Sequence, residues 1–286
     1  MKQPALQDDA FLEDVYSVSR DHSSLHIWWL GQSGFLVGWQ GRHLLFDPYL
    51  SDSLTKKYAE TEKPHVRMTE RVVAPERLGF IDVVTSSHNH TDHLDGETLK
   101  PLLRVNPNLK VVVPRANLEF AAERLQVSKE RLTPISVDGP VTANEIELHA
   151  VPAAHEKLEQ DDSGHYRCIG LLAKIGPWTL YHSGDTMLYE GMEERLQSFD
   201  IDIAFLPING RDPARGVAGN LSGEEAVSLA RDINASLVIP CHFDMFEFNT
   251  VPPQAFVEAA KRLDQPYALV KNGERLSLAA KREPLS

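Results

Sequence analysis

Short apolar runs dominate the first fifty residues of the chain. The stretches 25–30, 34–39 and 42–50 are apolar or alternate between apolar and polar positions, with glycine between them. This pattern predicts a meander of short strands. Ahead of them, residues 10–18 place apolar side chains at helical spacing and predict a short helix.

Beyond residue 80, buried-type strands alternate with amphipathic helices. Ser222 followed by Glu225 forms a capping-box pattern that predicts one helix start. The order of elements predicts an α/β protein in which a layered sheet sandwich carries its helices outside. No linker composition interrupts the chain, so we expect one domain over residues 1–286. Strands are predicted at 81–87, 110–114, 133–137, 145–151, 166–175, 178–185, 201–207 and 236–243, and helices at 94–105, 116–125, 190–199, 222–234 and 252–263, before two short runs, 267–270 and 275–278, close the chain.

One long segment fits neither period. Residues 51–78 are polar, include Pro64 and Pro75, and show no strong hydrophobic repeat. Connections of this length without regular structure are uncommon and often serve as functional lids. We therefore expect a long excursion of the chain, of the kind that often forms a lid.

Charge and composition exclude some classes of partner. The 286 residues carry a formal net charge of −12 and two cysteines. Phosphate backbones are bound by clustered basic residues, so nucleic acid and anionic membrane surfaces are disfavoured partners. A small anionic substrate remains compatible, because a bound metal supplies local positive charge. With no disulfide framework, signal-peptide pattern or membrane-length apolar run, we expect a cytoplasmic protein without membrane insertion, and a homo-oligomer stays open.

The stretch 86–97 is the densest chemical feature of the sequence. His88, His90, Asp92 and His93 form the pattern H-x-H-x-D-H between a predicted strand and a predicted helix. Residues two apart in an extended segment point the same way, so His88 and His90 can hold one ion together. Asp92 and His93 are turned to another side and can reach a second ion. The competing interpretation is a polar turn in which Asp92 caps the helix.

Three further residues follow predicted strands at similar places. His155, Asp185 and His242 each lie just beyond a strand. Any one of them alone is as easily a structural residue. As a set that arrives at strand ends, together with the histidine motif, they predict a metal site at one edge of a sheet. Imidazole and carboxylate ligands suit Zn, Mn or Fe.

Five stretches carry a family resemblance. WWLGQSGFLV, FDPYL, SSHNHTDHLD, LYHSGDT and LVIPCHFD resemble, in this order, the metallo-β-lactamase superfamily, with the L-ascorbate-6-phosphate lactonase-like branch as the nearest. The resemblance implies a four-layer αββα sandwich with the site along one edge. His155 stands where the lactonase carries a carboxylate, and residues 51–78 do not match it.

The resemblance also implies how ligands are shared between two ions. His88, His90 and His155 would bind one metal. Asp92, His93 and His242 would bind the second, and Asp185 would bridge both. The lactonase branch implies Mn²⁺, and the richer histidine set favours Zn²⁺, so one or two divalent ions are the expected cofactor.

These ligands predict a hydrolase that uses a metal-activated water on a small anionic ester or lactone. Asp185 and Asp92 are the expected catalytic carboxylates, with Asp92 serving to protonate the leaving group. The alternative is a metal-dependent phosphodiesterase acting on a phospholipid-like or nucleotide substrate. A non-enzymatic metal-binding protein is disfavoured, because all seven ligand positions are filled.

Substrate contacts and supporting residues are less strongly marked. In the Gly-rich segment 207–222, the candidates for binding an anionic group of the substrate are Arg211, Arg215 and Asn209. The alternative interpretation of this segment is a solvated loop. For His182 in YHSGD, a substrate contact and a structural hydrogen bond are equally supported. Weaker candidates to bind the substrate lie in the 51–78 segment, and these are Lys56, Lys57 and Arg67. Two aspartates, Asp47 and Asp244, are candidates to orient metal-bound imidazoles.

Overall fold

The structure is a computed structural model that describes residues 1–212 and 219–280. Of the residues singled out above, Arg215 lies outside the described residues. Among the described helices, none is both long and apolar enough to cross a membrane.

The first sheet has seven strands in the order β15-β1-β2-β3-β4-β5-β6. The meander β1 to β3 is antiparallel, and β3 to β6 run parallel. Its helices are α1, α2, α3 and α4, with 3₁₀ turns η1, η2 and η3. The bounds are β1 Ser24–Gly31, β2 Gly34–Trp39, β3 Arg42–Phe46, β4 Val83–Thr85, β5 Lys110–Pro114, β6 Leu132–Ile135, β15 Arg275–Ala279, α1 Asp8–Ser17, α2 Ser53–Tyr58, α3 Gly96–Val105, α4 Leu118–Leu125, η1 Pro75–Arg77, η2 Arg115–Asn117 and η3 Lys129–Arg131.

The second sheet has six strands in the order β14-β13-β12-β11-β8-β7, and a two-stranded ribbon β9-β10 lies beside it. Strands β8, β11 and β12 are antiparallel, and β12 to β14 are parallel. The bounds are β7 Val141–Ala143, β8 Ile146–Pro152, β9 Ala154–His155, β10 Lys157–Leu158, β11 Ile169–Ile175, β12 Trp178–His182, β13 Ile203–Pro207, β14 Leu237–Cys241, α5 Met192–Gln197, α6 Gly223–Asp232, η4 Glu247–Asn249 and α7 Gln254–Arg262.

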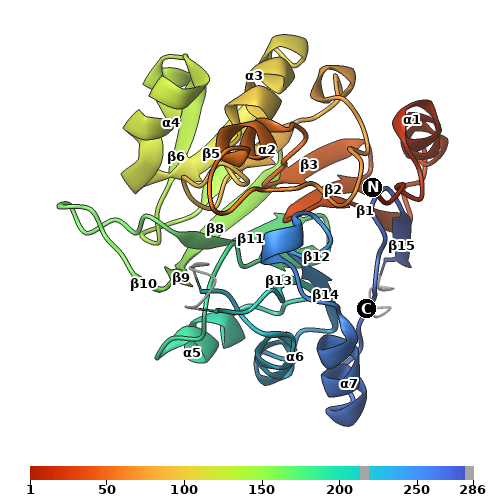
Figure 1. Cartoon of the computed structure of the whole chain (residues 1–286), viewed down its shortest axis with the longest axis vertical. Helices are drawn as coiled ribbons and strands as arrows, with labels where there is room; N and C mark the ends of the chain where they lie inside the picture. The colour runs from red at the N-terminus through yellow and green to blue at the C-terminus, as the bar shows by residue number, and fades with distance from the viewer. Residues whose placement is uncertain (213–218, 281–286) are drawn as a thin grey trace, which may run out of the picture.

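Two sheets face each other, and helices cover their outer sides. In Figure 1, α3 and α4 lie outside the first sheet, and α5, α6 and α7 lie outside the second. The four-layer αββα sandwich predicted from the sequence is confirmed.

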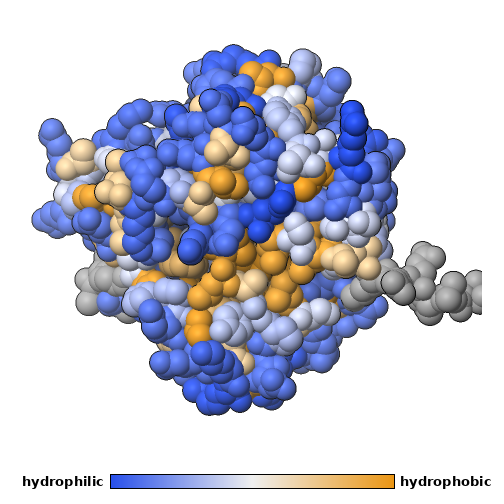
Figure 2. Space-filling model, turned by 90° about the vertical axis from the view of Figure 1, so that its right-hand side faces the viewer, coloured by the Kyte–Doolittle hydropathy of each residue, from blue (hydrophilic) through white to orange (hydrophobic). Residues whose placement is uncertain are grey.

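Both faces of the first sheet are buried, which explains its nearly continuous apolar strands. Ile27 faces the second sheet, whereas its neighbour Trp28 faces the outer helices. Between the sheets, the rings of Phe35 and Phe205 lie 4.3 Å apart. Figure 2 shows the side of the molecule where α1 and β15 lie, and apolar residues gather across its middle with polar surface above and below.

The structure differs from the predicted elements where tertiary contacts outweigh the local pattern. The 51–78 segment contains α2 and η1. Residues 267–270 form only an isolated bridge between Tyr267 and Val238. Strands β7, β9 and β10 are two or three residues long, too short to produce a visible period.

The capping box at the start of α6 is present as predicted. The Ser222 hydroxyl accepts a hydrogen bond from the backbone N–H of Glu225 at 3.2 Å, and the Glu225 carboxylate accepts one from the Ser222 N–H at 2.8 Å. We expect Ser222→Ala to lower the free energy of unfolding by about 1 kcal/mol, measured by urea denaturation. Ser228→Ala, inside the same helix, is the matched control and should cost less; equal losses would contradict a role for the cap.

Candidate metal centre

The histidine motif lies on the loop that leads from β4 into α3. His93 and Leu94 donate their backbone N–H groups to the His90 carbonyl and close a turn. The helix begins later than the sequence suggested, because Asp95 is its N-cap and accepts a hydrogen bond from the Glu97 N–H. The carboxylate of Asp92 is therefore not a helix cap, and it faces the cluster of histidines.

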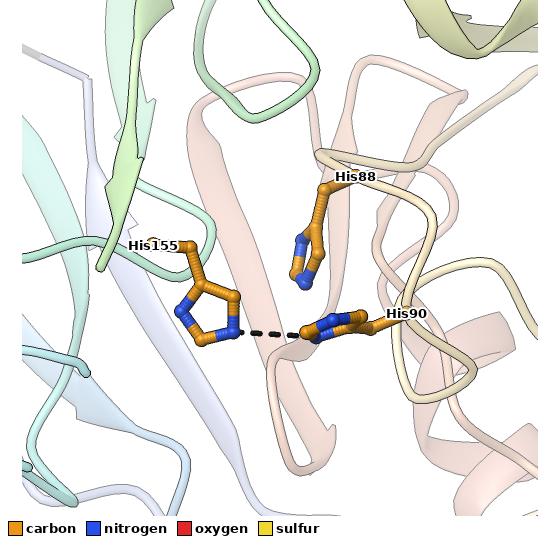
Figure 3. A group of neighbouring side chains, drawn as sticks. All are labelled: His88, His90 and His155. Carbon is orange, nitrogen blue, oxygen red and sulfur yellow. Dashed lines mark hydrogen bonds between the residues drawn. The ribbon is translucent and has the colours of Figure 1, made fainter. Parts of the chain in front are cut away.

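The first ligand group consists of His88, His90 and His155. One ligand atom from each lies within 4.8 Å of the others. His88 and His90 reach in from one loop and His155 from β9, so that the three rings converge (Figure 3). Nε2 of His155 lies 3.2 Å from Nδ1 of His90, while its Nδ1–H donates to the Gly219 carbonyl at 3.0 Å. This leaves the Nε2 lone pair of His155 directed into the group.

The second ligand group consists of Asp92, His93, Asp185 and His242, again within 4.8 Å. Nε2 of His93 lies 3.2 Å from Oδ1 of Asp185. Nε2 of His242 lies 3.3 Å from Oδ2 of Asp185 and 3.5 Å from Oδ2 of Asp92. Asp92 and His93 follow β4, Asp185 follows β12 and His242 follows β14, so three strand ends bring together residues that are far apart in the sequence.

Asp185 touches both groups. Its Oδ2 is 3.8 Å from Nε2 of His155 and 3.3 Å from Nε2 of His242. This position is compatible with the bridging role that the family resemblance implies. The seven predicted ligands thus form two adjoining groups with the predicted division of members.

The donor set fits divalent metal ions. Among the described residues, Nε2 of His88, Nε2 of His93 and Oδ1 of Asp185 are buried without a hydrogen-bond partner. Buried polar atoms are nearly always paired, and a cation between these lone pairs would satisfy all three. Imidazole and carboxylate ligands without thiolate suit Zn, Mn or Fe.

Electrostatics support the same conclusion. Burial alone would raise the pKa of Asp185, but His242 and His93 outweigh it and hold that pKa well below its usual value. Burial alone would lower the pKa of His242, but Asp185 and Asp92 raise it to about 9. Burial lowers the pKa of His88 well below its usual value. The carboxylates therefore hold protons on neighbouring imidazoles, which a divalent cation would displace on binding.

Asp47 supports His93 from behind. It is fully buried and accepts the Nδ1–H of His93 at 2.8 Å. The Thr85 hydroxyl and the Ser87 N–H also donate to its carboxylate. These bonds fix the His93 tautomer, so that Nε2 presents its lone pair to the second group. Asp244, the other candidate for this role, instead pairs with Lys2 at the surface at 2.8 Å.

Asp47→Asn is expected to weaken metal affinity by about 10- to 100-fold. Asparagine tolerates the positive φ of 35° at this position, but it lacks the second carboxylate oxygen and the negative charge. The measurement is competition for Zn²⁺ with a chromophoric chelator. Asp244→Asn is the matched control and should leave the affinity unchanged; similar losses in both variants would contradict the supporting role of Asp47.

The sequence did not reveal Gln32. It lies in the turn between β1 and β2, with a φ of 50°. Its amide Nε2 donates to Oδ2 of Asp92 at 2.8 Å and lies 3.0 Å from Nε2 of His242. Its Oε1 is buried without a partner among the described residues. The only sequence signal was its place in WWLGQSGFLV. A neutral amide in a glycine-flanked turn is as typical of a structural residue as of a functional one.

A cavity of about 400 Å³ opens over both ligand groups. Its walls are built from the histidine loop, the 51–78 segment and the loop after β14. Lys57 and Lys63 are exposed along it. The lining residues are Leu54, Lys57, Tyr58, Lys63, His65, Asn89, His90, Thr91, Asp92, Arg124, His155, Asp185, Asn220, His242, Phe246, Phe248 and Asn249.

The three residues predicted to bind the substrate, His182, Asn209 and Arg211, do not line this cavity. His182 is buried in the core, where its Nε2–H donates to the Ser33 carbonyl at 2.8 Å and its ring stacks on Phe46. Its structural interpretation is therefore the one that the geometry supports. Asn209 lies one layer behind the wall, bonded to Asn249 and Asn220.

The cationic candidates are also placed elsewhere, with one exception. Arg211 is exposed beside Glu225, with 3.6 Å between Nη2 and Oε1. Lys56 pairs with Glu97 at 3.0 Å, and Arg67 is buried among backbone carbonyls. Of the predicted cations that the structure describes, Lys57 is the one that lines the cavity.

Comparison with known proteins agrees with this geometry. Residues 42–243 match the family model described as "Beta-lactamase superfamily domain". A UPF0173 metal-dependent hydrolase of Metallosphaera sedula is 28% identical over 256 residues, covering 87% of this chain and 98% of the relative. Two solved structures share the fold, each with 18% identity. Igni18, a metallo hydrolase from Ignicoccus hospitalis, gives a TM-score of 0.66 over 91% of this chain and 100% of its own. The metallo-β-lactamase fold protein YhfI from Bacillus subtilis gives 0.64 over 89% and 99%. The model match spans more than half of the residues, and the chain therefore belongs to the metallo-β-lactamase superfamily.

Proposed function

We propose that this chain is a metal-dependent hydrolase that cleaves a small, negatively charged ester or lactone with water. The observation that carries the proposal is that both ligand groups open onto the floor of one cavity of small-molecule size. The names of the relatives support hydrolysis, and the sequence resemblance supports the L-ascorbate-6-phosphate lactonase-like branch. The histidine at position 155 is the main departure from that branch.

A metal ion bound here would lower the pKa of water and polarise the substrate carbonyl. The side chains of the site would then transfer the proton and position the reacting groups. Asp92 lines the cavity with 16% of its side chain exposed, and it can accept the proton of the attacking water. It then returns that proton to the alkoxide oxygen as the acyl C–O bond breaks. Gln32 holds Oδ2 of Asp92 in place for this transfer.

Asp185 serves a different purpose. Only 4% of its side chain is exposed, and it lies between the imidazoles of both groups. It is therefore placed to hold the ligand groups together and to orient the water, while the more accessible Asp92 moves the proton.

The preference for an anionic substrate rests on the cations along the cavity. Lys57 and Lys63 are exposed there. Arg124 also lines the cavity, but its Nη1 donates to the carbonyls of Asn89 and Leu94. The lysines are thus the residues best placed to attract a phosphate or carboxylate of the substrate.

The alternative, a phosphodiesterase, is favoured by one observation. Asp185 brings the two groups side by side, and two adjoining metal ions can clamp both oxygens of an in-line phosphoryl displacement. Turnover measured on a lactone, an ester and a phosphodiester distinguishes the two functions.

The test is turnover by protein that has been stripped of metal and reloaded with Mn²⁺ or Zn²⁺. The substrates are a phosphorylated lactone, the matching neutral lactone, 4-nitrophenyl acetate and bis(4-nitrophenyl) phosphate. We expect lactone and ester hydrolysis, fastest for the phosphorylated lactone, and loss of activity in His90→Ala. Absence of lactone and ester turnover with either metal would overturn the proposal, and turnover of the phosphodiester alone would establish the alternative.

A further inference from the structure

The 51–78 segment is held in place beside the metal centre. Arg67 is its anchor: the guanidinium pairs with Asp52 at 2.7 Å and donates to the carbonyls of Ser51 and Thr69. Backbone bonds join the segment to the loop after β14, from Met68 N–H to the Met245 carbonyl and from Glu247 N–H to the Val66 carbonyl. The segment is therefore a built wall of the cavity, and α2 lies close to the short helix η4 (Figure 1).

Aromatic rings form the inner surface of this wall. Tyr58 stacks on His65 with 4.3 Å between ring centroids and an interplanar angle of 23°. His65 in turn contacts Phe248 at 4.6 Å and Phe246 at 5.1 Å. All four residues line the cavity that contains the ligand groups. We call these four residues the aromatic wall.

The aromatic wall is uncharged at neutral pH. Burial lowers the pKa of His65, so its imidazole is neutral. Behind the wall, Tyr49 packs against Phe246 at 5.6 Å, and Leu54 and Met245 complete a small apolar cluster. The cluster fixes the rings: Phe246 is buried at their base, and the half-buried Tyr58, His65 and Phe248 present apolar surface to a ligand.

A substrate in this cavity meets two kinds of surface. On one side lie carboxylates and imidazoles of the ligand groups, and on the other lie the aromatic faces, with Lys57 Nζ 4.9 Å from the centroid of Tyr58. A wholly polar sugar would leave the apolar surface that Tyr58 and Phe248 expose to the cavity without an apolar ligand group. Pairs of aromatic rings contribute about 0.5–1.5 kcal/mol beyond the area that they bury.

We propose that the aromatic wall binds an aryl group of the substrate next to the bond that is hydrolysed, so that the preferred substrates are small aryl-bearing esters or lactones. The inference rests on the proposed function, because the bound aryl compound is a substrate only if the protein is a hydrolase. Two of the four wall residues, Tyr58 and His65, belong to the segment 51–78, and the inference names the specificity that this segment would confer together with the loop after β14.

The test uses metal-loaded protein and two carboxylate probes that resemble hydrolysis products, phenylacetate and acetate. Isothermal titration calorimetry should give at least tenfold tighter binding of phenylacetate, which corresponds to about 1.4 kcal/mol. In Tyr58→Leu the preference should fall several-fold, and in Tyr58→Phe it should be retained. Tyr16→Leu is the matched control, because Tyr16 is an exposed tyrosine of α1 outside the cavity, and should keep the wild-type preference.

Steady-state kinetics provide the second measurement. For phenyl acetate, Tyr58→Leu and Phe248→Leu should raise KM with little change in kcat, whereas KM for ethyl acetate should be unchanged. Equal affinity for phenylacetate and acetate in the wild-type protein would overturn the inference, even if lactones and esters are hydrolysed. A phenylacetate preference that depends on Tyr58, in a protein that hydrolyses no ester or lactone, would uphold aryl binding by the aromatic wall and overturn the proposed function.

Discussion

Asp185→Asn is expected to lower kcat/KM by about three orders of magnitude, or about 4 kcal/mol of transition-state stabilisation. The substitution keeps the size of the side chain but removes the negative charge that faces Nε2 of His155, His93 and His242. Both ligand groups lose a shared partner, so metal content should also fall. The measurement is kcat/KM with saturating metal, together with elemental analysis of the purified variant.

A matched control is available on the surface. Asp138→Asn changes an exposed aspartate, with 73% of its side chain accessible, by the same single atom and charge. It should leave activity and metal content at the wild-type level. A loss of less than tenfold in Asp185→Asn at unchanged metal content would remove Asp185 from the catalytic centre.

Arg67→Met is expected to lower the free energy of unfolding by about 3 kcal/mol. Methionine preserves much of the buried stem but leaves the carbonyls of Ser51 and Thr69 without their donor, at about 1–3 kcal/mol each for a buried unsatisfied group. It also removes the guanidinium that lies 5.4 Å from the centroid of the Tyr49 ring. The measurement is the midpoint and slope of urea denaturation.

The control for Arg67→Met is Lys56→Met in the same segment. Lys56 makes an exposed ion pair with Glu97, and such pairs contribute about 1 kcal/mol at most. A loss below about 1 kcal/mol in Arg67→Met would show that Arg67 does not anchor the cavity wall.

The convergence of the candidate ligands could be predicted from the sequence because its signals are local. His88, His90, Asp92 and His93 lie within six residues, and His155, Asp185 and His242 each follow a strand whose apolar pattern is visible. The layer order could be predicted for the same reason, since the longer strands and most helices carry apolar patterns that are visible in the sequence. Asp95 shows the limit of such signals: local pattern placed the helix start near Asp92, and hydrogen bonding placed it at Gly96.

The cavity wall formed by residues 51–78 could not be predicted, because contacts between distant segments fix its conformation. Residues 51–78 have no hydrophobic period of their own. The sequence made Arg67 a weak candidate to bind the substrate, because the carbonyls that accept its hydrogen bonds are brought together only by folding. Arg211 and Asn209 lie in a polar, Gly-rich stretch that is as typical of a binding loop as of a solvated one. Gln32 acts through a contact with Asp92, sixty residues away.

Anomalous X-ray diffraction from crystals of the metal-loaded protein tests the central claim most directly. Data collected on both sides of the Zn or Mn absorption edge locate each ion without reference to activity. We predict anomalous peaks within coordination distance of His88, His90 and His155, and of Asp92, His93, Asp185 and His242, at roughly 2.0–2.2 Å from the ligand atoms. Ions bound only at surface carboxylates, with both groups empty at saturating metal, would contradict the account.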